Sequence, residues 1–413
     1  MSYDVFSAFT LPNGNQLKNR FVKAAMEENL AGPGQLPDQA LLNLYSRWAQ
    51  GGVGLIITGN VMVDHLAMTG PGGVVLEADT ELGPFMALAQ AGQQDDCRIW
   101  MQINHPGRQV YKKLGGKALA PSAVALNLGK HSAMFAQPQA MTESEINDVI
   151  ARFVATAKRA QQAGFNGVEV HAAHGYLLAQ FLSPLSNKRD DQWGGSLANR
   201  ARLLLNIVEQ IRQQCRPGFD LAVKLNSADF QRGGFDVKDA EQVVNWLAER
   251  GVDLVELSGG NYEAPAMQGR SGDGRTLARE AYFLEFAKQI TRQATVPLMT
   301  TGGIRRLSTA EDVVESGIAL VGLASALAFT PDLPKRWFGN PQVLGLIPKV
   351  KWRDKGLSAL ANMALVKKQL RRMSRGLKPK RDNWAWWALL VDQLRSARLT
   401  KRYRRQYQAE LRN

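Results

Sequence analysis

The chain has 413 residues, 45% hydrophobic and 21% charged, which is the composition of an ordinary globular protein. Its two cysteines, Cys97 and Cys215, exclude a disulfide framework and a cysteine metal cluster, and they favour a reducing compartment. No apolar run approaches the roughly 20 residues that a membrane-spanning helix needs, and the first residues, MSYDVFSAFT, lack the pattern of a signal peptide, so we expect a cytoplasmic protein.

The formal net charge of +14 is concentrated at one end of the chain. Residues 335–413 contain 21 Lys and Arg but only 4 Asp and Glu, a net charge of +17, which leaves residues 1–334 with −3. The basic character therefore says nothing about what the first 334 residues bind. We predict two parts, a main unit over 1–334 and a basic, tryptophan-containing helical extension over 335–413.

Short apolar runs alternate with longer segments of helical period along residues 1–334. The runs are rich in Val, Ile and Leu, as strands buried on both faces are. They are Arg20–Ala25, Gly54–Thr58, Ile99–Ile103, Gly167–His171, Asp220–Leu225, Leu254–Leu257, Pro297–Thr301 and Leu320–Leu323. The clearest helices are expected over 144–163 and 196–214. Eight such units predict an α/β fold, an eight-stranded parallel (β/α)8 TIM barrel with an added C-terminal helical segment.

Two connections are long and irregular. Residues 105–141, after the third strand, hold several glycines and prolines and no sustained period, and we expect them to form a lid over a site. Residues 259–275, after the sixth strand, have the same glycine-rich character.

The basic extension contains Trp352, Trp384, Trp386 and Trp387. One interpretation is an extra helical layer packed on the barrel or on a second subunit of a homo-oligomer. Another is a basic face with tryptophans that makes peripheral contact with an anionic membrane. Nucleic-acid binding is not expected, because no recognised module accompanies the charge.

Small residues follow the last two predicted strands, at Gly302-Gly303 and at Ala324-Ser325. The loops at these positions of a barrel commonly bind phosphate through backbone N–H groups. A tight turn is the alternative for the glycine pair.

Polar side chains occur within or directly after three of the apolar strands. Gln102 and Lys224 lie inside strands, and His171 and His174 stand three residues apart at the end of another. A lysine inside a barrel needs a ligand or an ion pair, and a salt bridge to Glu169 or Glu256 is the alternative to ligand binding. The two histidines could likewise be structural.

The chain resembles the Old Yellow Enzyme family of FMN-dependent NAD(P)H:flavin oxidoreductases and ene-reductases. The similarity covers about residues 5–334. It is carried by HAAHGYLLAQFLSP at 171–184, with NKR at 187–189 and WGGSLANR at 193–200. LKNR at 17–20, the stretch 102–108, APS at 120–122 and PDL at 331–333 agree with it.

This resemblance implies a set of FMN contacts and NAD(P)H as the reductant. Lys224 would lie near N1 and O2 of the flavin, where positive charge stabilises the reduced ring. The implied cofactor residues are Ala24, Ala25, Met26, Gly59, Gln102, Lys224, Gly302, Gly303, Ala324 and Ser325.

The resemblance also implies the catalytic residues. His171 and His174 would bind the carbonyl oxygen of an α,β-unsaturated substrate, and Tyr176 would protonate its α-carbon after hydride transfer from flavin N5 to the β-carbon. Two imidazole N–H groups suit the enolate-like transition state, and a phenol can act as the proton donor.

The chain departs from the family pattern in three places. Glu27 stands where relatives usually have threonine or cysteine, and a carboxylate there would oppose negative charge on the flavin. Ala324-Ser325 replaces a Gly-Arg pair that binds the phosphate, which predicts weaker FMN binding. No cysteine follows Cys215, so the iron–sulfur cluster of the larger family branch is not expected.

We therefore predict an FMN-dependent NAD(P)H oxidoreductase of the ene-reductase type. One alternative is another FMN-barrel oxidoreductase, either amine dehydrogenase-like or flavin-shuttling. The other is a cofactor-poor barrel that acts as an interaction module through its basic extension.

Overall fold

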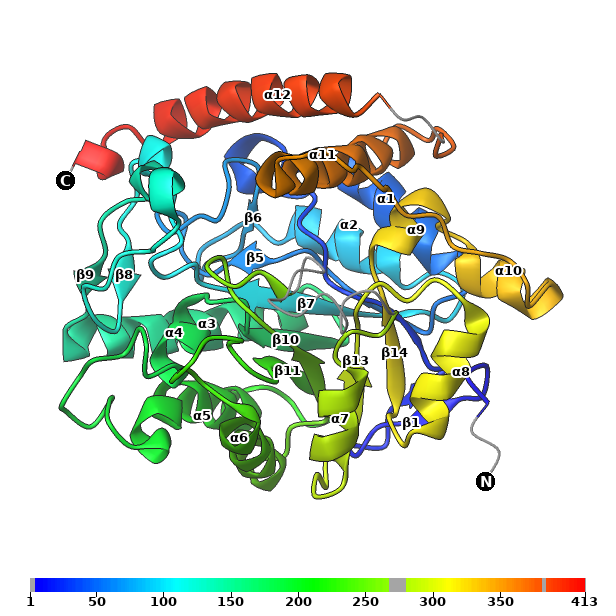
Figure 1. Cartoon of the computed structure of the whole chain (residues 1–413), viewed down its shortest axis with the longest axis horizontal. Coiled ribbons are helices and arrows are strands. Elements are labelled where there is room, and N and C mark those ends of the chain that lie inside the picture. The colour runs from blue at the N-terminus through cyan, green and yellow to red at the C-terminus, as the bar shows by residue number, and fades with distance from the viewer. Residues whose placement is uncertain (1–3, 267–279, 381–383, 413) are drawn as a thin grey trace.

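The computed structural model describes residues 4–266, 280–380 and 384–412. Eight parallel strands pair in a closed ring and form a barrel at the centre of the molecule (Figure 1). In ring order they are β3 (Phe21–Lys23), β4 (Leu55–Ile57), β7 (Arg98–Asn104), β10 (Gly167–Ala172), β11 (Asp220–Asn226), β12 (Leu254–Ser258), β13 (Leu298–Thr300) and β14 (Leu320–Leu323). The predicted (β/α)8 TIM barrel is confirmed, and all eight predicted strands are present.

The barrel interior changes from apolar to polar along its axis. One buried cluster joins Leu55, Trp100, Ala222 and Leu254, together with residues of the antiparallel hairpin β1 (Phe9–Thr10) and β2 (Gln16–Leu17). Side chains two residues apart on a strand point to the same face. Two positions after Trp100, Ala222 and Leu254, that face carries the buried polar residues Gln102, Lys224 and Glu256. The polar layer therefore lies toward the carboxyl ends of the strands, where barrel enzymes place their sites.

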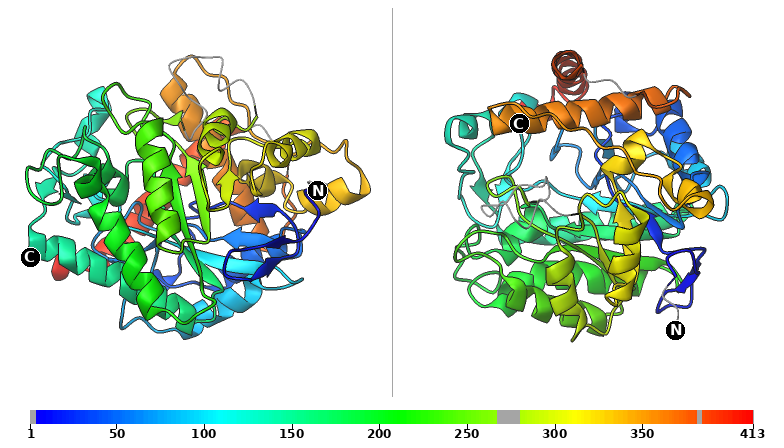
Figure 2. Two further views of the ribbon diagram at one scale, coloured as in Figure 1. Left: turned by 90° about the horizontal axis from the view of Figure 1, so that it is seen from below. Right: turned by 45° about the vertical axis from the view of Figure 1, so that its right-hand side comes forward.

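Helices cover the outside of the barrel (Figure 2). The two expected helices are present, and each begins at a side-chain cap: Thr142 forms a capping box with Glu145, and Ser196 accepts from the backbone N–H of Asn199. The helices are α1 (Gln39–Ala49), α2 (Gly83–Gly92), α3 (Glu143–Gln162), α4 (Leu177–Leu182), α5 (Leu197–Gln214), α6 (Val237–Glu249), α7 (Leu284–Thr291), α8 (Leu307–Glu315) and α9 (Ser325–Phe329).

Shorter elements fill the connections. Strands β5 (Val61–Met62) and β6 (Val74–Val75) extend the sheet beside β7, and η1 (Pro33–Gln35) precedes α1. The irregular segment 105–141 contains η2 (Lys112–Leu114), η3 (Gly129–Met134) and the paired strands β8 (Leu119–Ala120) and β9 (Gln139–Ala140). Of the second irregular stretch, residues 267–275 lie outside the described part of the chain.

The C-terminal extension forms helices, as predicted. These are α10 (Leu333–Gly339), α11 (Lys355–Met373), α12 (Ala385–Gln406) and the short η6 (Glu410–Arg412). Helix α11 packs on α1 and α9, and its Leu370 and Met373 belong to the main buried core. Helix α12 lies on the outer side of α11 (Figures 1 and 2). Within the described residues, every helix is too short or too polar to cross a bilayer.

Candidate active site

A cavity of about 710 Å³ lies at the carboxyl ends of the barrel strands. Residues from β3, β11, β13 and β14, or from the loops that follow them, form its inner wall. It brings together most of the residues that the sequence predicted for the cofactor: Ala24, Ala25, Met26, Lys224, Gly302, Gly303, Ala324 and Ser325, together with His174. Positions scattered over some 300 residues of sequence thus meet in one space.

Two predicted cofactor residues do not line this cavity. Gln102 is buried and donates from its Nε2 atom to Oε1 of Glu169 at 2.6 Å. Gly59 packs against Glu28, whose Oε2 atom would lie 2.0 Å from a Cβ at position 59. The backbone N–H of Gly59 donates to the hydroxyl of Tyr45 at 2.8 Å. Both residues therefore contact other parts of the protein and not this cavity.

The two histidines are neighbours. Their ring centroids are 5.0 Å apart, and the rings are nearly perpendicular. His174 has a φ of 60°, a conformation that non-glycine residues rarely adopt. Its backbone N–H donates to Oδ1 of Asn226 at 3.1 Å, which holds this strained turn, and its Nε2 atom lies 2.7 Å from the hydroxyl of Ser258.

Both imidazoles are uncharged at neutral pH. Burial lowers the pKa of His171 well below its usual value, and repulsion from the neighbouring His174 and Lys224 lowers it further. Burial, and then the charge of Lys224, lowers the pKa of His174 in the same way. The Nδ1 atom of His171 accepts from the backbone N–H of Ala173 at 3.2 Å, so the ring proton lies on Nε2. His171 Nε2–H is therefore a hydrogen-bond donor, and within the described residues no protein group accepts from it.

Tyr176 stands directly beside His171. The two ring centroids are 4.9 Å apart, and the Tyr176 hydroxyl lies 3.3 Å from the hydroxyl of Tyr262. Burial raises the pKa of Tyr176 far above its ordinary value, so the phenol keeps its proton at any physiological pH. Tyr262, which follows β12, was not identified from the sequence, although an aromatic residue just after a barrel strand could have been the signal.

The lysine in the polar layer is ion-paired. Lys224 Nζ lies 2.6 Å from Oε1 of Glu256. Glu256 is one of the two salt-bridge partners predicted from the sequence. Lys224 also lines the cavity, so the salt bridge and a ligand contact are compatible. Burial, and then the charge of Glu256, raises the pKa of Glu169 well above its ordinary value. The interior beneath the cavity therefore holds a neutral Glu169 beside a paired lysine and carboxylate.

The amino-acid sequence of the barrel shows to which family the chain belongs. Residues 4–339 match the family model described as NADH:flavin oxidoreductase / NADH oxidase. The chain belongs to this family. The resemblance to Old Yellow Enzyme is confirmed, and so, at the level of the family, are an oxidoreductase, FMN and NAD(P)H.

Individual relatives agree with this assignment. The chain is 37% identical over 385 residues to the NADH-dependent flavin oxidoreductase iliE of Neonectria sp. (strain DH2), a match that covers 85% of this chain but 49% of that protein. The match thus spans about half the length of that relative. It is 34% identical over 383 residues to iliE of Hypocrea jecorina, covering 85% of this chain and 95% of the relative. The structure of an Old Yellow Enzyme homologue from Zymomonas mobilis matches with a TM-score of 0.71 at 23% identity, covering 86% of this chain and 98% of the other, which shows a common fold.

The residues around the cavity fit the flavin of this family. Several small residues line it, which would leave space for a ring system and a phosphate, and Lys224 would bring a positive charge to such a group. The loop after β13 binds a carboxylate of the protein itself. The backbone N–H groups of Arg305 and Arg306 donate to Oε2 of Glu280 at 3.0 and 3.2 Å. The unusual Glu27 also lines the cavity, where its Oε1 atom accepts from the hydroxyl of Thr69 at 2.7 Å.

Tyr282 lies beside the glycine pair that the sequence predicted for phosphate binding. Its hydroxyl oxygen would be 2.3 Å from a Cβ at Gly303, and its backbone nitrogen would be 2.6 Å from a Cβ at Gly302. The glycine pair is thus required by close packing, and both glycines also have positive φ angles. This aromatic cover was not expected from the sequence.

The C-terminal extension forms the outer wall of the same cavity. Ile347, Val350, Trp352, Met363 and Lys367 line it from the segment before α11 and from α11 itself. Sequence reasoning placed the extension outside the barrel but did not assign it to the site. Helical periodicity shows which residues share a face, but not which neighbour that face meets.

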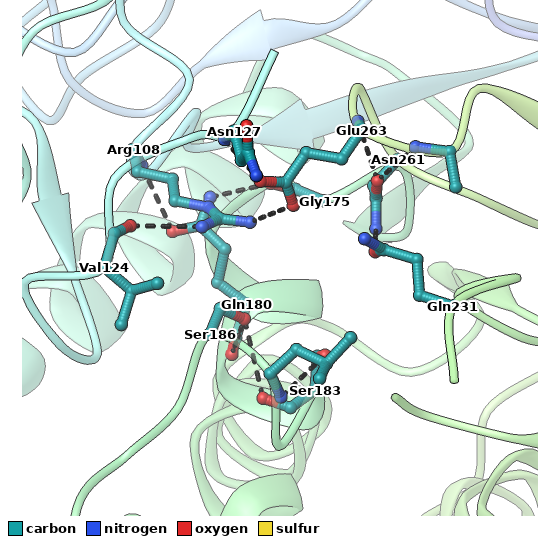
Figure 3. Close-up of polar contacts among 12 residues, drawn as sticks. Arg108, Val124, Asn127, Gly175, Gln180, Ser183, Ser186, Gln231, Asn261 and Glu263 are labelled. Carbon is teal, nitrogen blue, oxygen red and sulfur yellow. Dashed lines mark hydrogen bonds and ion pairs between the residues drawn. The ribbon is translucent and has the colours of Figure 1, made fainter. Parts of the chain in front are cut away.

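A polar network ties the loops around the histidine motif together (Figure 3). The guanidinium of Arg108 donates to Oε2 of Glu263 at 2.8 Å, and the backbone N–H of Asn127 donates to Oε1 of the same carboxylate at 2.6 Å. Gln180 accepts from the backbone N–H of Arg108 and donates to the carbonyl of Gly175. The segment 105–141 is thereby fixed to the loop after β12 and to the start of α4.

Proposed function

We propose that this chain is an FMN-dependent NAD(P)H oxidoreductase that reduces an alkene conjugated to a carbonyl group. The proposal rests on one observation: two neutral imidazoles and a protonated tyrosine stand together, and one of the imidazoles, that of His174, lines the cavity with most of the predicted cofactor residues. The geometry supports the roles that the family resemblance implied for His171, His174 and Tyr176.

Hydrogen bonding to the substrate oxygen is the first role. His171 Nε2–H can donate to a carbonyl oxygen, and Ser258 can donate to His174 Nε2 so that the His174 proton lies on Nδ1. Donors that face the developing negative charge stabilise it most in a water-poor site. Bound FMN would supply the hydride.

Proton delivery is the second role. The Tyr176 hydroxyl is held toward Tyr262 and, by burial, retains its proton until a carbon atom accepts it. The substrate is then a small α,β-unsaturated carbonyl compound. We also propose that residues 1–334 carry the chemistry while residues 335–413 add the outer wall of the cavity, and that the enzyme acts in the cytoplasm, in keeping with its two free cysteines.

An anaerobic absorbance titration tests this function. Freshly purified full-length protein with FMN should show the yellow flavin spectrum, lose it on addition of NADH or NADPH and regain it with cyclohexenone. Bleaching without reoxidation by any enone would favour the flavin-shuttling alternative. Failure to bind FMN at all would contradict the proposal.

A further inference from the structure

Exposed apolar side chains gather on the two long helices of the extension. Thirteen large apolar side chains in the described residues are exposed, and nine of them lie between residues 357 and 394. The largest are Trp384, Trp386 and Trp387, which are 75%, 65% and 57% exposed. A soluble surface rarely concentrates its apolar residues in this way unless they contact a partner.

The first parts of α11 and α12, which carry most of these side chains, pack against each other. Ala361 and Ala364 of α11 pack against Ala385 and Ala388 of α12, so the first halves of the two helices lie side by side. Trp352, just before α11, stacks on Trp386 with ring centroids 4.1 Å apart. We call the exposed residues Leu357, Leu360, Trp384, Trp387, Leu390 and Leu394 the docking face.

The docking face continues into unpaired positive charge. Trp387, Leu394, Arg398, Lys401 and Arg405 recur at intervals of seven, four, three and four residues, which places them on one outer stripe of α12. Within the described part of the chain, these three cations have no hydrogen bond or ion pair.

A groove lies at this basic end of α12. It has a volume of about 490 Å³ and is lined by Lys401, Arg404 and Arg405 but by no acidic residue. A groove of this kind suits an anionic headgroup.

We propose that α11 and α12 form a docking site for the surface of an anionic lipid bilayer. Tryptophan and leucine side chains suit the boundary between headgroups and acyl chains, and Lys and Arg are attracted to the negative lipid surface. A second copy of this chain is a poorer partner, because it would bring another strongly basic extension. A nucleic acid would suit the cations but would leave Leu360, Leu390 and Leu394 without apolar contact.

Docking places the cavity beside the membrane. Trp352 lines the cavity and stacks on Trp386. Met363 of α11 lines it as well and is 40% exposed. The outer wall of the cavity thus includes α11 and touches α12, the two helices that carry the docking face.

Vesicle cosedimentation of the full-length protein tests the proposal without relying on activity. Binding is expected to vesicles of phosphatidylcholine mixed with phosphatidylglycerol, to weaken as salt is added, and to be far weaker with phosphatidylcholine alone. The double variant Lys401→Glu/Arg405→Glu should bind the anionic vesicles at least about tenfold more weakly, and Trp387→Ser/Leu394→Ser should do the same.

Matched controls lie on the barrel. Arg232→Glu/Lys238→Glu reverses two exposed cations near and on α6, and Met86→Ser removes an exposed apolar side chain from α2. Both should bind like the wild type. Circular dichroism should show that every variant is folded.

Three results would overturn the proposal. The first is an absence of binding to anionic vesicles by the folded wild type. The second is equal loss of binding in the barrel controls. The third is a concentration-dependent dimer, or a nucleic-acid complex, that Trp387→Ser/Leu394→Ser abolishes while vesicle binding stays unchanged.

Discussion

The barrel interior and the C-terminal extension differ in the burial and pairing of their charged side chains. In the barrel, Lys224 is paired with Glu256 at 2.6 Å and Lys23 lies 3.8 Å from Glu28, and all four residues are buried. On the outer face of α12, Arg398, Lys401 and Arg405 are exposed and, within the described residues, unpaired. Burial makes an unpaired charge costly, whereas an exposed one is free to attract an external anion. The two regions are thus suited to different tasks.

Burial also decides protonation within the barrel. It lowers the pKa of Lys23 to about 8 even with Glu28 nearby, and it keeps His171 and His174 neutral. A neutral imidazole has one donor and one acceptor, and the backbone of Ala173 fixes which nitrogen of His171 donates. The site therefore acts through fixed hydrogen bonds, and the extension through its net charge.

The largest expected effect comes from removing the proton donor of the barrel site. Tyr176→Phe should slow reoxidation of the NADH-reduced enzyme by an enone by about 10²–10⁴-fold, because general acid catalysis contributes that much. Stopped-flow absorbance measures this step, and the reduction step with NADH should keep its rate. Tyr262→Phe is the matched control and should have a smaller effect. Full reoxidation rate in Tyr176→Phe would remove the tyrosine from the mechanism.

Breaking the buried ion pair should be the next largest change. Lys224→Met leaves the buried Glu256 without its cationic partner, which should lower the free energy of unfolding by about 3–5 kcal/mol. Urea denaturation of the flavin-free protein measures it. Lys238→Met, at an exposed position of α6, should change that free energy by less than about 0.5 kcal/mol. Equal effects in both variants would mean that Lys224 is not held as described.

A pH-dependent contact joins the two regions. His65 of the barrel lies 2.9 Å from Glu77 and 2.5 Å from Glu410 of the extension. The hydrogen bond that His65 donates to Glu77 is the main cause that raises the pKa of His65 to about 9, and Glu410 adds to it. Because the folded pKa lies above the unfolded value of about 6.5, this stabilisation is complete below pH 6.5 and is lost as the pH rises through 9.

The variant His65→Gln tests that contact. It should lower the free energy of unfolding by about 1 kcal/mol at pH 6, a modest value because the pair is partly exposed. By pH 10 the difference from wild type should shrink. Urea denaturation at several pH values measures both, and a constant difference across this range would exclude the proposed titration.

The smallest expected effect tests whether the docking face contributes to folding. Trp387→Ser should change the free energy of unfolding by less than about 0.5 kcal/mol, since the side chain is 57% exposed. The fully buried Trp48→Ala should cost about 3–5 kcal/mol. Thermal or urea unfolding compares them, and a large loss from Trp387→Ser would mean that the helix face is structural.

The barrel could be predicted from sequence because its strands are short, apolar and regularly spaced. Runs such as 220–225 and 254–257 are buried on both faces, so composition alone reveals them. The histidine motif could be predicted because its residues are contiguous. The cofactor residues were found by family resemblance, and the structure brings all except Gly59 and Gln102 to the cavity wall.

Partners that meet only in the folded chain could not be predicted. Ser258 ends β12 and Tyr262 follows it, whereas His174 and Tyr176 follow β10, so their contacts depend on how the barrel strands pack. The contact of Gln102 with Glu169 likewise requires the register of β7 beside β10. Helix α11 reaches the cavity through its packing on α9 and α1, which no local pattern specifies.

Reoxidation of the NADH-reduced, FMN-loaded protein by cyclohexenone tests the central claim most directly, because it isolates the step in which the imidazoles hold the substrate oxygen. The wild-type rate constant should be independent of pH between about 6.5 and 10, since His171 and His174 stay neutral and Tyr176 stays protonated across that range. His171→Ala/His174→Ala should be at least about 100-fold slower. An unchanged rate constant in this double variant would contradict the account.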